Sequence, residues 1–238
     1  MFISITALPQ FLIRMRFLCI CFFLITQISF SQTKELRAYT SPSTEPSGKL
    51  FNTQTGKFFS DEDIQKLKVD IPNFRYEPVY DVAGKVEKYL FDPNEPQKIV
   101  RRNPALQPKV GESFPEFVFQ TVKGKELTSA SLNGKWTLLY FKNSLSTLNQ
   151  AQFEKLLSDL VEVSKEEKIE AIAIFAYDEP IETLLENRPI DGVKNGNGFF
   201  QRFHLTSMPT VFLINPEGQT TAKFEGIKPI EFRSYLGN

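Results

Sequence analysis

Side chains able to do covalent chemistry are scarce in this chain, so their positions limit its function. The sequence has two cysteines, Cys19 and Cys21, and one histidine, His204. Thiol–disulfide exchange needs a thiolate, and a zinc or haem site needs nitrogen or sulfur ligands. No cysteine follows residue 21. We therefore predict no metal site and no cofactor, and any thiol chemistry depends on the fate of the first residues.

Those first residues have the pattern of a secretory signal peptide. Arg14 and Arg16 precede an apolar run over residues 17–25, which a short polar stretch with small residues follows. The run is shorter than the ~20 residues that span a bilayer. We predict a signal peptide over residues 1–31, cleaved before Gln32. The mature protein would then be cysteine-free, periplasmic or secreted, and without a stable membrane span.

Two alternatives concern the same segment. Translation from Met15 would leave the signal intact, since residues 1–14 add little to it. A lipidated cysteine is disfavoured, because Phe17 and Leu18 stand before Cys19 where a small residue is expected.

Charge balance excludes other classes of function. Lys plus Arg and Asp plus Glu each number 28 among 238 residues. Such a chain has no global field that favours nucleic acid, so we predict no nucleic-acid partner. Hydrophobic residues make up 41% of the sequence, enough for a core without a metal or disulfide staple.

Two other constellations have residue types found in functional sites. Ser146 with His204 would be a hydrolase pair only if the two side chains met and an acid oriented the histidine. A structural histidine is the simpler interpretation. The glycine-containing run 195–198 lacks the Lys-Ser/Thr of a phosphate-binding loop, so we predict a flexible loop there.

Composition divides the chain into segments. Residues 32–48 are rich in Ser, Thr and Pro and predict a flexible leader. A small α+β module over 49–95 follows, then a proline-containing linker over 96–109 and a main domain over 110–238. A module of this size has too little core to be stable alone, so we expect it to pack on the main domain.

The module has two predicted hairpins and one helix. The hairpins lie within residues 50–59 and 74–91, and the run Ser60-Asp-Glu-Asp63 is typical of a capping box that begins a short helix. Four phenylalanines would fill its core or, alternatively, form a partner-binding patch: Phe51, Phe58, Phe59 and Phe74.

The main domain alternates strands and helices, which predicts an α/β fold with a mixed central sheet. A β-hairpin opens it. The strands that follow are expected at 137–141, 169–176, 210–215 and 220–225, and the helices at 147–165, at 179–187 and from 228. The long helix should bury Phe153, Leu156, Leu157, Leu160 and Val161.

Several motifs in this order resemble the thioredoxin-like superfamily, in particular its exported redoxin branch of TlpA/ResA-like and AhpC/TSA-like proteins. The matching runs are Val110 to Phe117, Leu132 to Trp136, Leu138 to Phe141, and Ser207 to Ile214 continuing into Asn215-Pro216-Glu-Gly218. The resemblance covers about residues 108–238. It implies a thioredoxin fold, namely a central mixed sheet flanked by helices with an N-terminal β-hairpin extension.

The resemblance also locates the family's active-site motif. Redox-active members carry Cys-x-x-Cys at the start of the helix after the first central strand, where the helix N-terminus favours a thiolate. The matching positions here are Ser146, Thr147, Leu148 and Asn149. In the peroxiredoxin pattern, Thr147 matches the family threonine and Gln150 takes the peroxidatic position. Neither alignment supplies sulfur.

A second family feature is retained. Met208-Pro209 matches the loop whose proline is cis in thioredoxins, where the preceding residue pairs with an extended peptide. The motif preserves either a peptide-binding groove or only the fold.

We therefore predict an exported thioredoxin-like protein without thiol redox activity, which binds a protein or peptide partner in the cell envelope. One alternative is a thiol-disulfide oxidoreductase or antioxidant redoxin. Another is a structural interaction protein acting through residues 49–95.

Overall fold

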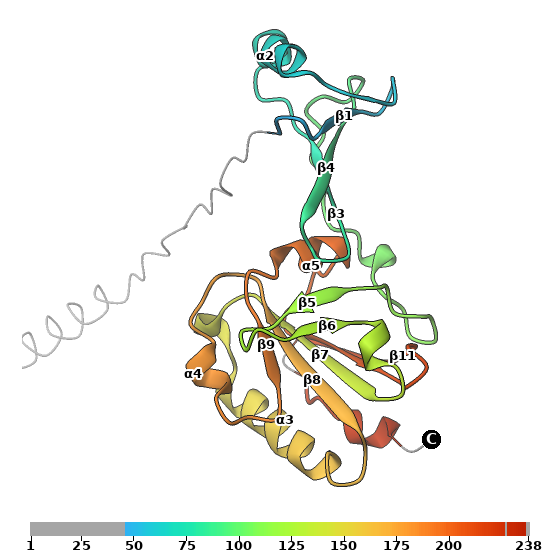
Figure 1. Ribbon diagram of the computed structural model, residues 1–238, viewed down its shortest axis with the longest axis vertical. Coiled ribbons are helices and arrows are strands. Elements are labelled where there is room, and N and C mark those ends of the chain that lie inside the picture. Colours follow the sequence, from blue (N-terminus) through green and yellow to red (C-terminus); the bar gives the residue numbers. More distant parts are fainter. Residues whose placement is uncertain (1–45, 227, 237–238) are drawn as a thin grey trace, which may run out of the picture. The chain divides into compact units, whose positions relative to one another are not determined.

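We describe residues 46–226 and 228–236 of a computed structural model (Figure 1). The predicted signal peptide, its cleavage site and most of the predicted leader lie outside these residues. Within the part of the chain that is described, no helix is both long enough and apolar enough to cross a membrane.

A five-stranded mixed sheet forms the centre of the main domain, in the order β11-β10-β7-β8-β9. Strands β7 (Trp136–Lys142), β8 (Ile169–Phe175) and β9 (Asp191–Val193) are parallel. Strands β10 (Thr210–Ile214) and β11 (Thr220–Glu225) continue the sheet in antiparallel pairing. This arrangement confirms the predicted α/β fold with a mixed sheet; β9 was not predicted.

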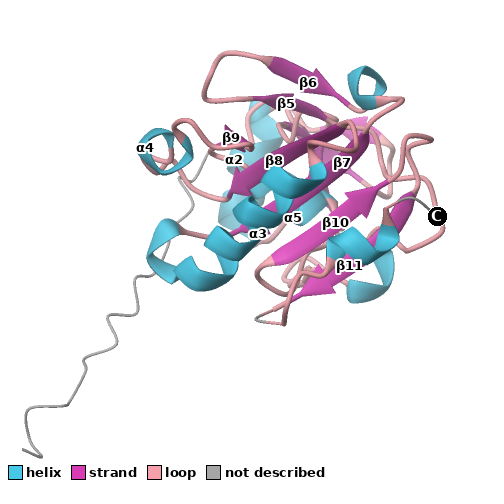
Figure 2. Cartoon of the chain, turned by 90° about the horizontal axis from the view of Figure 1, so that it is seen from below, coloured by secondary structure: helices cyan, strands magenta, loops and turns pink. Residues whose placement is uncertain are grey.

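Helices cover both faces of this sheet (Figure 2). Helix α3 (Gln150–Val163) packs on the face that carries Leu138 and Tyr140. Helix α5 (Asn197–Arg202) packs on the opposite face with Leu139 and Phe141. Because β7 is buried along its whole length, its side chains alternate between two apolar cores.

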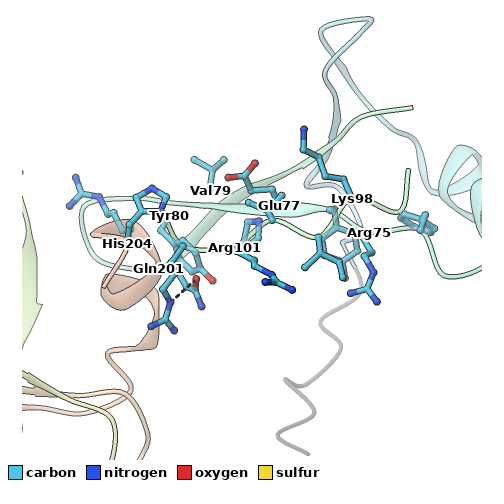
Figure 3. A pocket seen from close by; sticks show the side chains of 15 residues that line it. Arg75, Glu77, Val79, Tyr80, Lys98, Arg101, Gln201 and His204 are labelled. Atoms are coloured by element: carbon cyan, nitrogen blue, oxygen red, sulfur yellow. Dashed lines mark hydrogen bonds between the residues drawn. The ribbon is translucent and has the colours of Figure 1, made fainter. Parts of the chain in front are cut away.

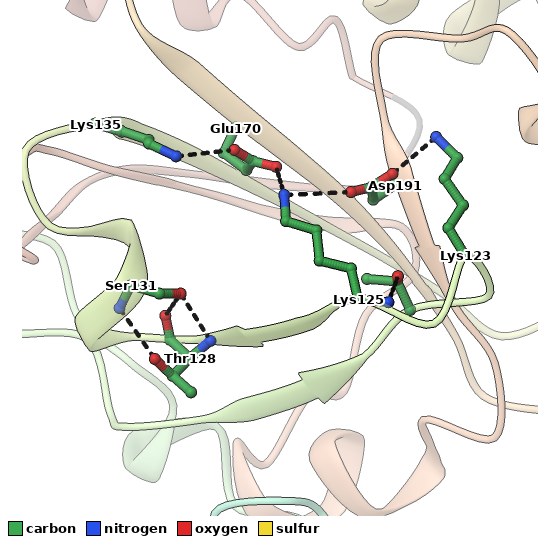
Figure 4. Close-up of polar contacts among 8 residues, drawn as sticks. Lys123, Lys125, Thr128, Ser131, Lys135, Glu170 and Asp191 are labelled. Atoms are coloured by element: carbon green, nitrogen blue, oxygen red, sulfur yellow. Dashed lines mark hydrogen bonds and ion pairs between the residues drawn. The ribbon is translucent and has the colours of Figure 1, made fainter.

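The predicted opening hairpin consists of β5 (Val118–Gln120) and β6 (Glu126–Thr128). A row of ion pairs with alternating charges joins the turn of this hairpin to β8 and β9 (Figure 4). Lys125 lies 2.8 Å from Glu170 and 3.8 Å from Asp191, while Lys123 and Lys135 extend the row at 2.8 Å and 3.3 Å. Such partly exposed pairs stabilise modestly, but together they fix the hairpin against the sheet edge.

The small module also has its own sheet. Its strands are β1 (Leu50–Asn52), β2 (Lys57–Phe58), β3 (Glu77–Tyr80) and β4 (Val86–Phe91), in the order β2-β1-β4-β3. Helix α2 (Asp61–Asp70) begins at Ser60, and the predicted capping box is present in both directions.

The module's phenylalanines divide between core and surface. The rings of Phe59 and Phe74 pack against Phe91, with centroids 5.8 Å and 5.5 Å away. Phe58 stays 55% exposed and contacts Phe51 edge-on. The suggested patch is therefore at most the Phe51–Phe58 pair.

The module joins the main domain at the β3–β4 turn, where two backbones meet. A Cβ atom added to Gly198 would lie 1.8 Å from the carbonyl oxygen of Gly84, so only glycine fits at this contact. The Val118 N–H also donates to Val82 O at 2.7 Å. These contacts hold α5 and β5 against the module.

Three expected helices and one expected loop differ from the structure. The long helix begins later than residue 147, since the Asn149 side chain caps it by accepting from the Gln152 N–H. Its buried residue after Leu160 is Val163, and Val161 is 45% exposed, because the buried stripe continues at a spacing of three.

The other differences follow from weak local signals. The helix expected over 179–187 is the short α4 (Glu182–Leu185). The helix expected from 228 is a 3-10 turn, η4 (Phe232–Tyr235). The loop expected at 195–198 instead leads directly into α5. Glycine and asparagine are poor helix formers, and packing of Gly198 against Gly84 overrides that preference.

Candidate functional site

The four residues that match the family's active-site motif lie at the carboxyl end of β7. A 3-10 turn, η3 (Leu145–Thr147), contains Ser146 and Thr147. Leu148 follows it, and Asn149 is the N-cap of α3. The chain therefore places these residues at a strand end and a helix start.

A hydrogen-bond network centred on Glu179 fixes this turn. One carboxylate oxygen of Glu179 accepts from the Ser144 hydroxyl at 2.6 Å, and the other accepts from the Leu145 N–H at 2.7 Å. The hydroxyls of Ser144 and Ser146 lie 2.8 Å apart. The turn is thus held by oxygen and nitrogen groups, and Glu179 is a site residue that sequence reasoning missed.

The Met208–Pro209 loop lies beside this turn. Its peptide bond is cis. The residue after Pro209, Thr210, pairs directly with Phe141 near the end of β7. The loop after β11 also joins the two segments, since Pro209 O accepts from the Gly226 N–H at 2.8 Å and Gly226 O accepts from the Gln152 amide at 3.3 Å.

The backbone N–H and carbonyl of Met208 are available for hydrogen bonding beside this turn. Its side chain packs partly buried against the core below, and Pro209 is buried. The Thr210 hydroxyl donates to Ser207 O at 2.7 Å. No hydrogen bond from another described residue reaches the N–H or the carbonyl of Met208. An extended chain can therefore pair with Met208 without displacing an existing bond.

Two polar side chains are buried below the turn, on the α3 face of β7. Lys142 is 6% exposed and has no ion pair with another described residue, and burial lowers its pKa. The Tyr140 hydroxyl has no hydrogen-bond partner in the described chain, and burial raises the pKa of this phenol. Neither group reaches the hydrogen-bond network of Glu179.

The structure does not bring Ser146 and His204 together as a hydrolase pair. The Ser146 hydroxyl bonds to Ser144, whereas His204 Nδ1 accepts from the Asn103 N–H at 3.3 Å. Over residues 46–226 and 228–236, no group of three or more His, Cys, Asp or Glu side chains is placed to hold a metal ion.

Sequence reasoning also missed a pocket of about 500 Å³, lined by β3, the segment 98–102 and the end of α5 (Figure 3). Its basic side chains come from three separate parts of the sequence: Arg75, Lys98, Arg101, Arg102, Arg202 and His204. No local motif joins these residues. The two arginines within the predicted linker were the one available signal.

No protein-family model matches the sequence, and no curated protein matches it. Solved structures similar to the chain include the C-terminal domain of a proposed thiol-disulfide oxidoreductase from Bacteroides thetaiotaomicron. It is 19% identical, with 53% of this chain and 92% of that chain covered and a TM-score of 0.44.

Two further similar structures are a protein from Chlorobium tepidum proposed to be the thiol:disulfide interchange protein DsbE, and BsSco. The first is 17% identical, with 54% of this chain and 93% of that chain covered and a TM-score of 0.44. BsSco, a member of the Sco family of cytochrome c oxidase assembly proteins, is 15% identical, with 54% and 92% covered and a TM-score of 0.43.

Likeness at this level carries no argument about function. The strand order, the parallel pairing of β7 with β8 and the antiparallel β10–β11 pair themselves define a thioredoxin-like fold. The predicted fold is therefore confirmed.

Proposed function

We propose that this chain is an exported, thiol-independent binding protein that holds an extended peptide at the turn Ser146–Asn149 and at Met208. The proposal rests on one observation: the backbone N–H and carbonyl of Met208 have no hydrogen-bond partner among the described residues, and they lie beside a turn that hydrogen bonds to Glu179 hold. A fixed site with free backbone groups suits main-chain pairing, which gives affinity without covalent chemistry.

The lack of any cysteine after residue 21 supports the non-redox part of this proposal. Cys19 and Cys21 are the only cysteines, and both fall in the segment whose pattern indicates a signal peptide. A serine hydroxyl at position 146 neither ionises near neutral pH nor forms a disulfide. An oxidoreductase function, the main alternative, would require those two cysteines to be retained.

Chemical-shift mapping by NMR tests the binding site. The probe is the B chain of insulin with its thiols blocked by iodoacetamide, an unfolded peptide that cannot exchange disulfides. We expect saturable shifts confined to residues 144–149 and 207–208. Met208→Asp should abolish them, because it places a charge beside the peptide, whereas Val110→Asp changes an exposed residue elsewhere and should not.

Two outcomes contradict the proposal. One is the absence of shifts at saturating probe with a well-folded protein. The other is a set of shifts that avoids residues 144–149 and 207–208, which would place peptide binding on another surface.

A further inference from the structure

The pocket between β3, the segment 98–102 and the end of α5 holds four arginines that form no ion pair within the described chain: Arg75, Arg101, Arg102 and Arg202. Elsewhere in the described chain, cations commonly have carboxylate partners, as in the row of ion pairs around Glu170. We call this set of residues the arginine pocket. No carboxylate of the described chain is therefore within ion-pair distance of these four guanidinium groups.

Two of these guanidinium groups are half-buried and bond only to neutral acceptors. Arg102 donates to Leu205 O at 2.6 Å and to Gln201 Oε1 at 3.2 Å. Arg202 donates to the backbone oxygen of Glu116. Burial lowers the pKa of both groups. The carboxylates of Asp81 and Glu116 act on Arg202 from beyond ion-pair distance and offset part of this effect. Removing such cations from water is costly, and an anion in contact with both guanidinium groups would offset that cost.

The other two guanidinium groups are exposed and available. No described residue forms a hydrogen bond or ion pair with the side chains of Arg75 or Arg101. In the view of Figure 3, both extend to one side of β3, whereas Glu77 and Lys98 extend to the other. Glu77 is the one acidic residue among those lining the pocket, and Lys98 is already paired with Glu95.

The length of the pocket favours an extended polypeptide over a small anion as its ligand. Consecutive residues 74–80 form one wall, and an extended run rises about 3.3 Å per residue, so this wall is about 20 Å long. A single phosphate would reach only a fraction of that length. Exposed apolar groups also line the pocket, since Ile99 is 58% and Val100 45% exposed.

The edge of the module sheet also limits how an extended chain can pair with β3. Strand β3 is the last strand of its sheet, and an edge strand can align an extended chain beside it. However, Pro78 lies within β3 and has no N–H to donate. A full backbone ladder is therefore not available, and side-chain charge must provide most of the affinity.

We propose that the arginine pocket binds an extended acidic segment of a partner polypeptide, whose carboxylates meet the guanidinium groups and whose apolar side chains contact Ile99 and Val100. This surface is separate from the peptide site at Met208, and neither proposal depends on the other.

Fluorescence anisotropy with the purified full chain tests the proposal. The probe is a labelled peptide in which glutamate alternates with tyrosine, and the control peptide has lysine in place of glutamate. We expect binding of the acidic probe only, weakening as salt rises. Arg75→Gln/Arg101→Gln should weaken it about fivefold or more, because two charge pairs are lost.

A double variant outside the arginine pocket provides the control for the loss of charge. Lys57→Gln/Lys165→Gln removes the same net charge outside the pocket and should leave the affinity unchanged within about twofold, since only long-range attraction is lost. Because Arg75 and Arg101 have no side-chain partners in the described chain, their replacement should preserve the circular dichroism spectrum and the thermal midpoint.

Three outcomes overturn the proposal. One is that the acidic peptide does not bind to the folded protein, and another is that both double variants weaken its binding equally. Alternatively, inorganic phosphate or phosphatidylglycerol vesicles bind with sensitivity to Arg75→Gln/Arg101→Gln while the peptide does not, which assigns the pocket to a phosphate group.

Discussion

The turn at residues 144–149 and the arginine pocket differ in how their polar groups are paired. In the turn, both carboxylate oxygens of Glu179 accept hydrogen bonds from the segment they hold. In the arginine pocket, four guanidinium groups have no carboxylate of the described residues within ion-pair distance. The position where the resemblance places catalytic cysteines is thus held by hydrogen bonds within the chain. The unsatisfied charge lies instead where the module meets the thioredoxin-like domain.

The largest expected effect comes from breaking the contact on which the arginine pocket depends. Gly198→Ala would place a methyl group within 1.8 Å of Gly84 O, where only backbone movement can make room. We expect the free energy of unfolding in urea to fall by about 3 kcal/mol. Hydrogen exchange should accelerate in α5 and β3 and remain unchanged at residues 144–149.

A second glycine provides the control for that variant. Gly124, unlike Gly198, has a positive φ, and an added Cβ there would meet nothing within 4 Å. Gly124→Ala should therefore cost only the local backbone strain, about 1 kcal/mol. Equal losses in the two variants would mean that the Gly84–Gly198 contact is not what holds the module.

The next effect concerns the turn at residues 144–149. Glu179→Gln keeps one acceptor but loses the charge, so the Ser144 hydroxyl or the Leu145 N–H loses its bond. We expect a loss of about 2 kcal/mol in urea unfolding and faster hydrogen exchange over residues 144–148. Glu186→Gln, an exposed control, should have no effect. An unchanged stability for Glu179→Gln would show that the network does not fix the turn.

A smaller effect of opposite sign is expected at Lys142. Burial lowers its pKa, so the folded state disfavours the protonated form that predominates at neutral pH. Lys142→Met should therefore raise the unfolding free energy by about 1 kcal/mol. Since the folded pKa lies below the ordinary lysine value, wild-type stability should rise as pH increases through that window, and the gain from Lys142→Met should shrink. A gain that does not change with pH would contradict this cause.

The smallest effect is expected within the arginine pocket itself. Arg101→Gln should change the free energy of unfolding by less than about 0.5 kcal/mol, because its side chain has no partner in the described chain. Arg102→Gln should cost about 1 to 2 kcal/mol, since two hydrogen bonds are lost. The urea midpoints check both. A large loss for Arg101→Gln would assign it a structural role in place of binding.

The sequence predicted the central sheet well because its buried strands are continuous apolar runs. Residues 137–141 and 210–215 are recognisable without any partner, and the N-cap Asn149 lies two residues after the predicted helix start. Strand β9 is short and contains Gly192, so it has almost no local signal. This segment becomes a strand because it pairs with β8, and its own sequence does not reveal that pairing.

The site was predictable in part for a similar reason. Ser146 to Asn149 and Met208 follow from motifs that are continuous in the sequence. The Glu179 contact joins residues that are 34 and 35 positions apart, and the arginine pocket joins segments around residues 75, 101 and 202. Such groupings arise only from tertiary packing, so periodicity and composition do not reveal them.

Insulin reduction in the presence of dithiothreitol tests the central claim that this protein of thioredoxin-like fold works without thiol chemistry. The wild-type protein should give the rate of the blank. Ser146→Cys/Asn149→Cys restores a dithiol at the matching positions and should give a rate above the blank, which shows that the assay can detect activity in this fold. Wild-type activity above the blank would contradict the account, and its loss on Cys19→Ser/Cys21→Ser would identify those two thiols as the source.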